Sequence, residues 1–454
     1  MVYKKFCADS FHSRNLRSRI LSARNFFKKH NEMLLYEHGK RVLNLAISSH
    51  AVDKRVINGK VNVDEGIKNF NSILTEILLY HTIDMSHVNP NNCELPEVVK
   101  NSAVLVLELQ KFSIITNLIR SGAPPLELVN AVNYRGAPLA ALPAILIDVA
   151  QTHLDDSKTF RFIKKNYDPI FRFYKSKEEA DVVALNTAKF GEIFLAQVAE
   201  LFGYPSIAGE IFLQSYSVNH PYLFETIVKF NKDSETIRRL ETTCALVRSI
   251  RKAIKGALSS MYFEFELQLR EKKNLGKQMK KLAFRLRKDY PSIIAHGNVD
   301  SEKQVNEQKK VLSKLSLFDF FNDLVALRVI IDKFKGKPLV ELSQEENKNI
   351  VDAVKDLVCQ VVRTINPLSH KKYKIDEKFY NTERGYKSWH LDIDPLDDTF
   401  SKYEIQIRTR EWHDIAEYGK AAHYLYIGDF GNSDLLEKIQ SSYQELLTSL
   451  RNHK

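Results

Sequence analysis

Apolar residues recur every three or four positions through the first half of the chain, a period typical of helices that bury one face. The spacing is clearest in residues 67–78, which follow Asp64, and in residues 190–202, which end at Gly203. An acidic residue before a helix and a glycine after it are common end signals. Clusters of Gly, Pro and Asn separate one such stretch from the next. The sequence therefore predicts an all-α first domain, followed by a long helix over residues 237–254.

Beyond this helix, apolar and polar residues alternate, as they do in strands with one buried face. Alternation or a continuous apolar run predicts strands at residues 263–269, 324–331, 389–393 and 403–407. Residues 350–362 return to the helical period. We expect an α+β chain with an all-α domain over residues 1–230 and a mixed-sheet domain over residues 231–454. The polar segment 291–314 is expected to be an insertion or mobile loop.

Composition and charge limit the classes of protein to which the chain can belong. The chain has 454 residues, of which 44% are hydrophobic and 27% charged, as in ordinary soluble globular proteins. No apolar stretch is long enough to cross a bilayer, and no secretory signal is recognisable, so we expect no membrane partner. The four cysteines lie far apart, which argues against zinc or disulfide frameworks and predicts a cytoplasmic location. A formal net charge of +11 indicates anionic partners such as nucleotides, nucleic acid or an acidic surface.

Polar residues on the faces of the expected strands are the candidate chemistry, because the common phosphate-binding loops are absent. One face of the strand at 403–407 carries Glu404, Gln406 and Arg408, and one face near 386–390 carries Tyr386, Ser388 and His390. Asp323 stands at the mouth of the apolar strand at 324–331, and Arg328 lies within that strand. Carboxylates can hold Mg²⁺, cations can neutralise phosphate charge, and an aromatic ring can hold a base. The alternative is a half-exposed sheet whose polar face meets water.

Four motifs in order resemble the synthetase domain of the RelA/SpoT homologues, the enzymes that make guanosine tetra- and pentaphosphate. Glu404–Thr409 followed by Trp412–His423 is similar to that family's "EvQIRT…mHxxAExGxAAH" stretch. Gly385–His390 resembles its "GYqSLH", and Asp323–Val329 resembles its "DlxAxRv". Upstream, Arg270, Lys272 and Lys280 stand at the offsets of its basic ATP-binding motif.

The resemblance implies a role for each matching residue. The ATP phosphates would be held by Arg270, Lys272, Lys280 and Arg328. Asp323 and Glu404 would bind Mg²⁺, and Glu404 would also activate the attacking 3′-hydroxyl. Tyr386 would stack on guanine, while His390, Gln406 and His413 would line the acceptor nucleotide. The implied enzyme is a bacterial GTP/GDP diphosphokinase with a nucleotidyltransferase-like fold, which transfers pyrophosphate from ATP to GDP or GTP.

The sequence departs from the family pattern near these motifs. Arg384 stands for the family's Asn, the pair Asn381-Thr382 stands for Pro-Lys, and Gly276 stands for Ser. The spacing between Lys280 and Asp323 is also longer than is usual in the family. Two alternatives therefore stay open: pyrophosphorylation of the 3′ end of tRNA by the same site, and a catalytically decayed regulator that binds nucleotide or RNA. The sequence gives no support for control by the ribosome.

The first half resembles the HD-type hydrolase domain of the long family members, through Glu37–Val42 and Phe194–Gly203. Aligned on the family's metal ligands, Tyr80 stands for His, His81 for Asp and Gln151 for another Asp, while Met85 replaces a further acid. Only His38 remains of the ligand set, so the resemblance predicts an inactive pseudo-hydrolase that does not hold Mn²⁺. The alternative is a rebuilt metal site that uses His81, His87 and His153.

Overall fold

The computed structural model describes residues 15–30, 33–49, 51–52, 57–58, 65–81, 96, 99, 103–122, 141, 143–150, 177–201, 204–271, 275–294, 299–314, 316–321, 323–365, 373–383, 385–396 and 398–418. Contacts between Cα atoms divide the chain into two compact units, and the division lies between His220 and Pro221. The sequence analysis places it after residue 230. Each unit is described by itself below.

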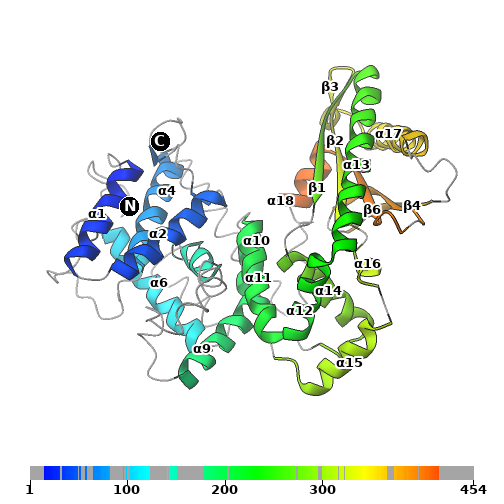
Figure 1. Ribbon diagram of the computed structural model, residues 1–454. Helices are drawn as coiled ribbons and strands as arrows, with labels where there is room; N and C mark the ends of the chain where they lie inside the picture. Colours follow the sequence, from blue (N-terminus) through cyan, green and yellow to red (C-terminus); the bar gives the residue numbers. More distant parts are fainter. Residues whose placement is uncertain are drawn as a thin grey trace. The chain divides into compact units, whose positions relative to one another are not determined.

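The first unit consists of helices wherever the structure describes it, as the apolar period predicts (Figure 1). Its helices are α1 (Leu16–Lys29), α2 (Met33–Ser48), α4 (Glu65–Tyr80), α6 (Ala103–Ser121), α9 (Lys177–Phe190), α10 (Ala196–Leu201) and α11 (Pro205–Asn219). Residues 143–150 form a further helical segment. Across α1 and α4, Arg19 Nη1 donates to Glu76 Oε1 over 2.6 Å, and both side chains are 1% exposed. This ion pair therefore lies within the core of the unit.

The helix expected over residues 190–202 is interrupted by a π-helical turn, η3 (Gly191–Leu195), between α9 and α10. Gly191 faces α11 so closely that a Cβ atom would lie 2.1 Å from Ser215 Oγ. A wider turn moves the backbone locally and is often found where a helix meets such a constraint. Within the same turn, buried Glu192 accepts hydrogen bonds from Asn219 Nδ2 at 2.9 Å and pairs with His220 Nε2 at 3.2 Å.

The second unit is built on a six-stranded mixed sheet in the order β1-β2-β6-β5-β4, with β3 paired to β2. Its strands are β1 (Phe263–Glu271), β2 (Val325–Phe334), β3 (Lys337–Pro338), β4 (Lys374–Asn381), β5 (Lys387–Asp394) and β6 (Tyr403–Thr409). Strands β2 and β6 are parallel, and the other pairs are antiparallel. The strands predicted from alternation are all present. The apolar run at 324–331 is an internal strand, as its composition predicts.

Two long helices cover one face of this sheet, α13 (Ser234–Ser260) and α17 (Gln344–Ile365). The core between them and the sheet takes alternate strand residues, among them Leu327, Val329, Ile405, Ile407 and Leu391. Because successive strand residues point to opposite faces, the intervening polar residues lie on the other face. The remaining helices are α12 (Pro221–Lys232), α14 (Leu275–Asp289), α15 (Glu302–Leu312), α16 (Leu317–Phe320) and α18 (Arg410–Tyr418), with a 3₁₀ turn η4 (Leu339–Glu341).

The segment expected to be a loop within 291–314 is instead largely the helix α15. It begins with a capping box, in which the Ser301 hydroxyl accepts from Gln304 N and the Gln304 side chain accepts from Ser301 N. Its Gln308 Nε2 donates to Ile293 O and to Asp300 Oδ2, both at 2.8 Å. These contacts hold a charge-rich helix that has little apolar surface to bury. Among the described residues, no helix is long and apolar enough to span a membrane.

Candidate active site

Strand register brings the predicted polar residues together on the sheet face opposite α13 and α17. Arg328 of β2 pairs in register with Gln406 of β6, and Gln406 pairs with His390 of β5. Ala326 pairs with Glu404, which in turn faces Asp392. Residues directly opposite each other on neighbouring strands share a face. The site is therefore assembled by pairing between segments that are far apart in the sequence.

A closed circuit of side-chain hydrogen bonds joins five residues of this face, which we call the polar ring. Arg408 Nη2 donates to Tyr386 Oη at 2.7 Å, and Tyr386 Oη pairs with His390 Nε2 at 2.7 Å. His390 Nδ1 lies 2.5 Å from Glu404 Oε1. Gln406 Nε2 donates to Glu404 Oε2 at 2.7 Å and Arg408 Nη2 to Gln406 Oε1 at 2.9 Å, which closes the ring. Tyr386, His390, Glu404 and Gln406 were all predicted site residues.

Electrostatics favour the anionic form of Glu404. Burial opposes its ionisation, but the hydrogen bond and charge of His390 outweigh burial, so the pKa of Glu404 is below its usual value. The Asp323 carboxylate acts in the opposite direction on this pKa, which means that the two acids lie near each other. Both stand at the beginning of the parallel strands β2 and β6. Two neighbouring carboxylates of this kind fit a hard divalent cation such as Mg²⁺.

Asp323 already has a cationic partner within the chain, because it forms an ion pair with Lys281 of α14. Arg328 is 7% exposed, and its Nε donates to Gln406 Oε1 at 2.9 Å. Lys280 is also buried, at 9% exposed, on α14. Lys281 thus pairs directly with one carboxylate, while Arg328 bonds Gln406, which in turn bonds Glu404.

The other predicted site residues lie outside the polar ring. Arg270 of β1 is paired in register with Ala326, on the same sheet face as the ring. His413 lies buried on α18. Lys272 lies outside the described residues, so the predicted basic motif is only partly described. The ATP and acceptor roles of all these residues stay predictions.

The structure adds three residues that the sequence analysis did not assign. Arg408 belongs to the polar ring, Lys281 pairs with Asp323, and Asp392 is the cross-strand neighbour of Glu404. Burial, and then the charge of Glu404, raise the pKa of Asp392. Strand alternation already placed Arg408 and Asp392 on polar faces and could have found them. No sequence signal distinguishes Lys281 from the other lysines of α14.

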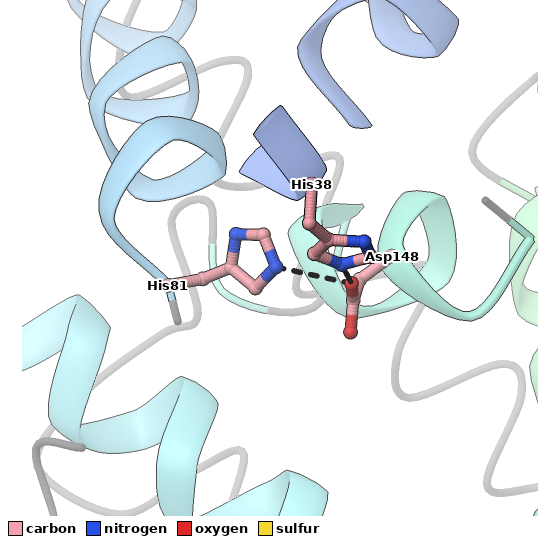
Figure 2. Close-up of side chains that lie close together, drawn as sticks. All are labelled: His38, His81 and Asp148. Carbon is pink, nitrogen blue, oxygen red and sulfur yellow. Dashed lines mark hydrogen bonds and ion pairs between the residues drawn. The ribbon is translucent and has the colours of Figure 1, made fainter. Parts of the chain in front are cut away.

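A separate cluster in the first unit contains His38, His81 and Asp148 (Figure 2). Asp148 Oδ1 lies 2.9 Å from His38 Nε2 and 3.0 Å from His81 Nε2, and one ligand atom from each residue lies within 4.8 Å of the others. Burial opposes ionisation of Asp148, but the two imidazoles outweigh it and hold the pKa of this carboxyl well below its usual range. We call these residues the His–His–Asp cluster.

The hydrogen bonds of His81 show that the cluster fits a metal ion. His81 Nδ1 lies 3.0 Å from Leu78 O, and a carbonyl oxygen only accepts, so Nδ1 carries a proton. In the neutral imidazole, Nε2 then presents a lone pair toward the Asp148 carboxylate. A second proton on His81 or a cation between the two groups resolves this repulsion. A histidine that ligates metal through Nε2 and donates Nδ1–H to a carbonyl is a common arrangement.

The sequence analysis kept only His38 as a metal ligand in the first unit, whereas the structure brings His81 and Asp148 beside it as two further groups that could hold a metal ion. The alignment placed Gln151 at the position of a ligand aspartate, but the carboxylate that reaches His38 belongs to Asp148, three residues earlier. His81, taken as a replacement, is itself a member of the cluster. The alternative site with His87 and His153, like Met85 and Gln151, lies outside the described residues.

Comparisons with known proteins concern mainly the second unit. Residues 302–429 match the family model described as "Region found in RelA / SpoT proteins". The "Probable GTP diphosphokinase RSH3, chloroplastic" of Oryza sativa subsp. japonica is 32% identical over 117 residues, 26% of this chain and 14% of that protein. The match thus spans a small part of the relative.

Among solved structures, the small alarmone synthetase 1 from Bacillus subtilis is 16% identical and matches 45% of this chain and 90% of its own, at a TM-score of 0.21. Superposition at this level supports no conclusion about the fold. The family assignment depends instead on the matched sequence region, which contains Asp323, Arg328, Tyr386, Glu404 and the rest of the polar ring. At residues 302–429 the chain therefore carries a region similar to the one found in RelA/SpoT proteins.

Proposed function

We propose that the second unit transfers pyrophosphate from ATP to the 3′-hydroxyl of GDP or GTP. The observation that carries this proposal is the polar ring, in which an aromatic platform, Tyr386, and a buried carboxylate, Glu404, are hydrogen-bonded through His390. A guanine on Tyr386 would bring its own ribose toward Glu404. The matched relative is named a probable GTP diphosphokinase, which agrees with this assignment.

The chain's residues have separable tasks in this reaction. Arg328 and Lys280, with Arg270 and Lys272 upstream, would hold the ATP phosphates and neutralise charge that spreads over them in the transition state. Glu404 is anionic and would accept a hydrogen bond from the attacking hydroxyl, which attacks the β-phosphorus as AMP leaves. Gln406, His390 and His413 would orient the acceptor. Bound Mg²⁺, held by Asp323 and Glu404, would supply further charge neutralisation.

The test is product formation by the purified chain with ATP, Mg²⁺ and GDP or GTP. We expect AMP and a 3′-pyrophosphorylated nucleotide, and we expect Glu404→Gln to lower turnover by about two to three orders of magnitude. The matched control is Glu377→Gln on β4, a carboxylate of the same sheet that pairs with Lys355. Equal activity of Glu404→Gln and wild type would contradict the proposal. Labelled ATP with tRNA in place of GTP separates the tRNA alternative, and absence of all transfer favours the decayed regulator.

We further propose that the His–His–Asp cluster holds a divalent metal ion without hydrolysing the nucleotide product. Two imidazoles and a carboxylate are a typical ligand set for Mn²⁺ and related ions. Hydrolysis is not expected, because Met85 stands where the family has a catalytic acid. The first unit is therefore proposed as an HD-like domain that keeps part of its metal site.

Two measurements test this second proposal separately from the first. Metal content after dialysis against Mn²⁺ should show one ion per chain, and Asp148→Asn should abolish it. Incubation of the wild type with guanosine tetraphosphate and Mn²⁺ should release no pyrophosphate. Measurable Mn²⁺-dependent hydrolysis would overturn the prediction of an inactive hydrolase. The cytoplasmic location also stays a prediction, and the rice relative's name places that protein in the chloroplast.

A further inference from the structure

Arg408 is the most highly connected side chain of the polar ring, although it contributes no group that the proposed chemistry needs. It is 2% exposed on β6, which is unusual for an arginine. Its Nε donates to Ser388 Oγ at 3.1 Å, and its Nη2 donates to Tyr386 Oη at 2.7 Å and Gln406 Oε1 at 2.9 Å. Its guanidinium carbon also lies over the Tyr386 ring, 5.0 Å from the centroid.

The donors of Arg408 fix the direction of the hydrogen bonds around the ring, because a guanidinium cannot accept. Gln406 Oε1 accepts from Arg408 and from Arg328, so Gln406 Nε2 must donate to Glu404. Tyr386 Oη accepts from Arg408 and pairs with His390 Nε2, and His390 Nδ1–H donates to the Glu404 carboxylate. Both oxygens of Glu404 therefore accept hydrogen bonds, and Arg408 fixes the direction of the one from Gln406 and holds Tyr386, the partner of His390.

The guanidinium also determines how Tyr386 can hold a base. A cation over one face of an aromatic ring occupies that face and is attracted to its electron density. A base would then have to stack on the face that the guanidinium does not cover. The same contact restrains the rotation of the ring, because Arg408 bonds the phenol oxygen as well. A platform held in this way loses less conformational entropy when a nucleotide binds.

We propose that Arg408 is a positioning residue that couples the guanine platform to Glu404. It holds Tyr386 with one face open for the acceptor base and orients the hydrogen bonds that fix the Glu404 carboxylate. The acceptor nucleotide, and not ATP, is the substrate whose binding depends on it. This inference rests on the proposed pyrophosphate transfer, and it names the residue that sets acceptor recognition at the same site.

The experiment compares Arg408→Gln and Arg408→Lys with the wild type, and uses Arg410→Gln as the matched control. Arg410 is the neighbouring arginine, and it donates to Asp332 and Glu266 at 2.7 Å instead of to the ring. Loss of a hydrogen bond from a charged donor corresponds to about a tenfold change in an equilibrium constant. We expect Arg408→Gln to raise the KM for GDP or GTP about tenfold or more, while the KM for ATP changes less than about twofold.

Two further readouts separate positioning from loss of folding. Lysine keeps the charge over the Tyr386 ring, so Arg408→Lys should recover part of the acceptor affinity that glutamine loses. The affinity for GDP, measured by calorimetry without ATP, should decrease in the same order, from wild type to Arg408→Lys to Arg408→Gln. Arg410→Gln should match the wild type in both assays.

Several outcomes would overturn the inference. If Arg408→Gln lowers kcat and melting temperature but leaves GDP affinity unchanged, Arg408 is only structural. If both KM values rise together, the arginine does not distinguish acceptor from donor. If the wild type transfers no pyrophosphate, the proposed function fails, but GDP calorimetry still decides the role of Arg408. Equal GDP affinity of wild type and Arg408→Gln would then refute the inference separately.

Discussion

Substitution of Asp148 is the sharpest test of the His–His–Asp cluster, because this one carboxylate contacts both imidazoles, at 2.9 and 3.0 Å. Asp148→Asn keeps the size of the side chain and removes its charge. A neutral amide oxygen is a much weaker ligand than a carboxylate, while His38 and His81 stay in place. The change therefore separates metal binding from the packing of the helical segment that carries residue 148.

The size of the effect follows from linkage between metal binding and folding. Mn²⁺ at 100 times its Kd stabilises the folded unit by about 2.7 kcal/mol. For a unit of about 150–250 residues, each kcal/mol moves the melting temperature by about 2–4 °C, so the wild type should gain about 5–11 °C. If Asp148→Asn weakens binding about 100-fold, the same Mn²⁺ concentration adds only about 0.4 kcal/mol, or about 1–2 °C.

The assay is a thermal melt of metal-stripped protein with and without Mn²⁺, and the measured quantity is the metal-induced shift. His220→Asn is the matched control, because His220 is buried and pairs with a carboxylate, Glu192, at 3.2 Å in the same unit. It should lower the starting melting temperature and leave the shift unchanged. A full shift in Asp148→Asn, or no shift in the wild type, would refute the metal assignment.

Three further predictions concern single contacts. Lys281→Met removes the cation that would compete with Mg²⁺ for Asp323. The Mg²⁺ concentration needed for half-maximal activity should therefore fall severalfold when turnover is measured against Mg²⁺ concentration. Glu76→Ala removes the carboxylate that pairs with the buried Arg19 guanidinium, and it should lower the free energy of unfolding, measured in urea, by about 3–5 kcal/mol. An unchanged urea midpoint of unfolding would show that water reaches Arg19. Burial first, and then the neighbouring Glu377 carboxylate, raise the pKa of the Cys359 thiol to about 11. Alkylation of Cys359, followed by mass spectrometry, should therefore be slow at pH 8 and become fast only as the pH approaches that value.

Period and alternation predicted four of the six strands of the second unit and both helices that cover its sheet, for a simple reason. The strand β6 buries Tyr403, Ile405 and Ile407 against the helices, so the period of two places Glu404, Gln406 and Arg408 on the other face whatever the rest of the fold does. The helix α13 was likewise recognisable from its apolar spacing. Local pattern is sufficient when one face of an element is buried.

The polar ring could not be derived in the same way, because its contacts depend on register between distant strands. Arg328 meets Gln406 only because β2 and β6 pair in parallel with that offset, and a shift by one residue would turn the whole strand over. The helix α15 was missed for a different reason, since its charge suggested a loop. The spacing of Ser301 and Gln304 was nevertheless a capping-box signal in the sequence.

The sequence analysis did not single out Asp148, because a weak motif can be aligned with a helix in several registers. A shift of three residues in the alignment exchanges Asp148 for Gln151, and positions three apart share one face of a regular helix. Only the contact with His38 Nε2 decides between them. From a single sequence, the conclusion that a ligand residue is absent is therefore weak, because another alignment of the same motif can supply one.

Both carboxylates of the candidate active site are satisfied by groups of the chain itself. Glu404 is bonded by His390 and Gln406, and Asp323 is paired with Lys281. An isolated buried carboxylate would be costly, so these partners stabilise the fold before any ligand arrives. A ligand must then exchange for them, and a doubly charged cation gains more from Asp323 than an ammonium group does. Lys281, once displaced from Asp323, would be close enough to meet the phosphates that accompany the cation, so exchange at this pair would bind cation and nucleotide together.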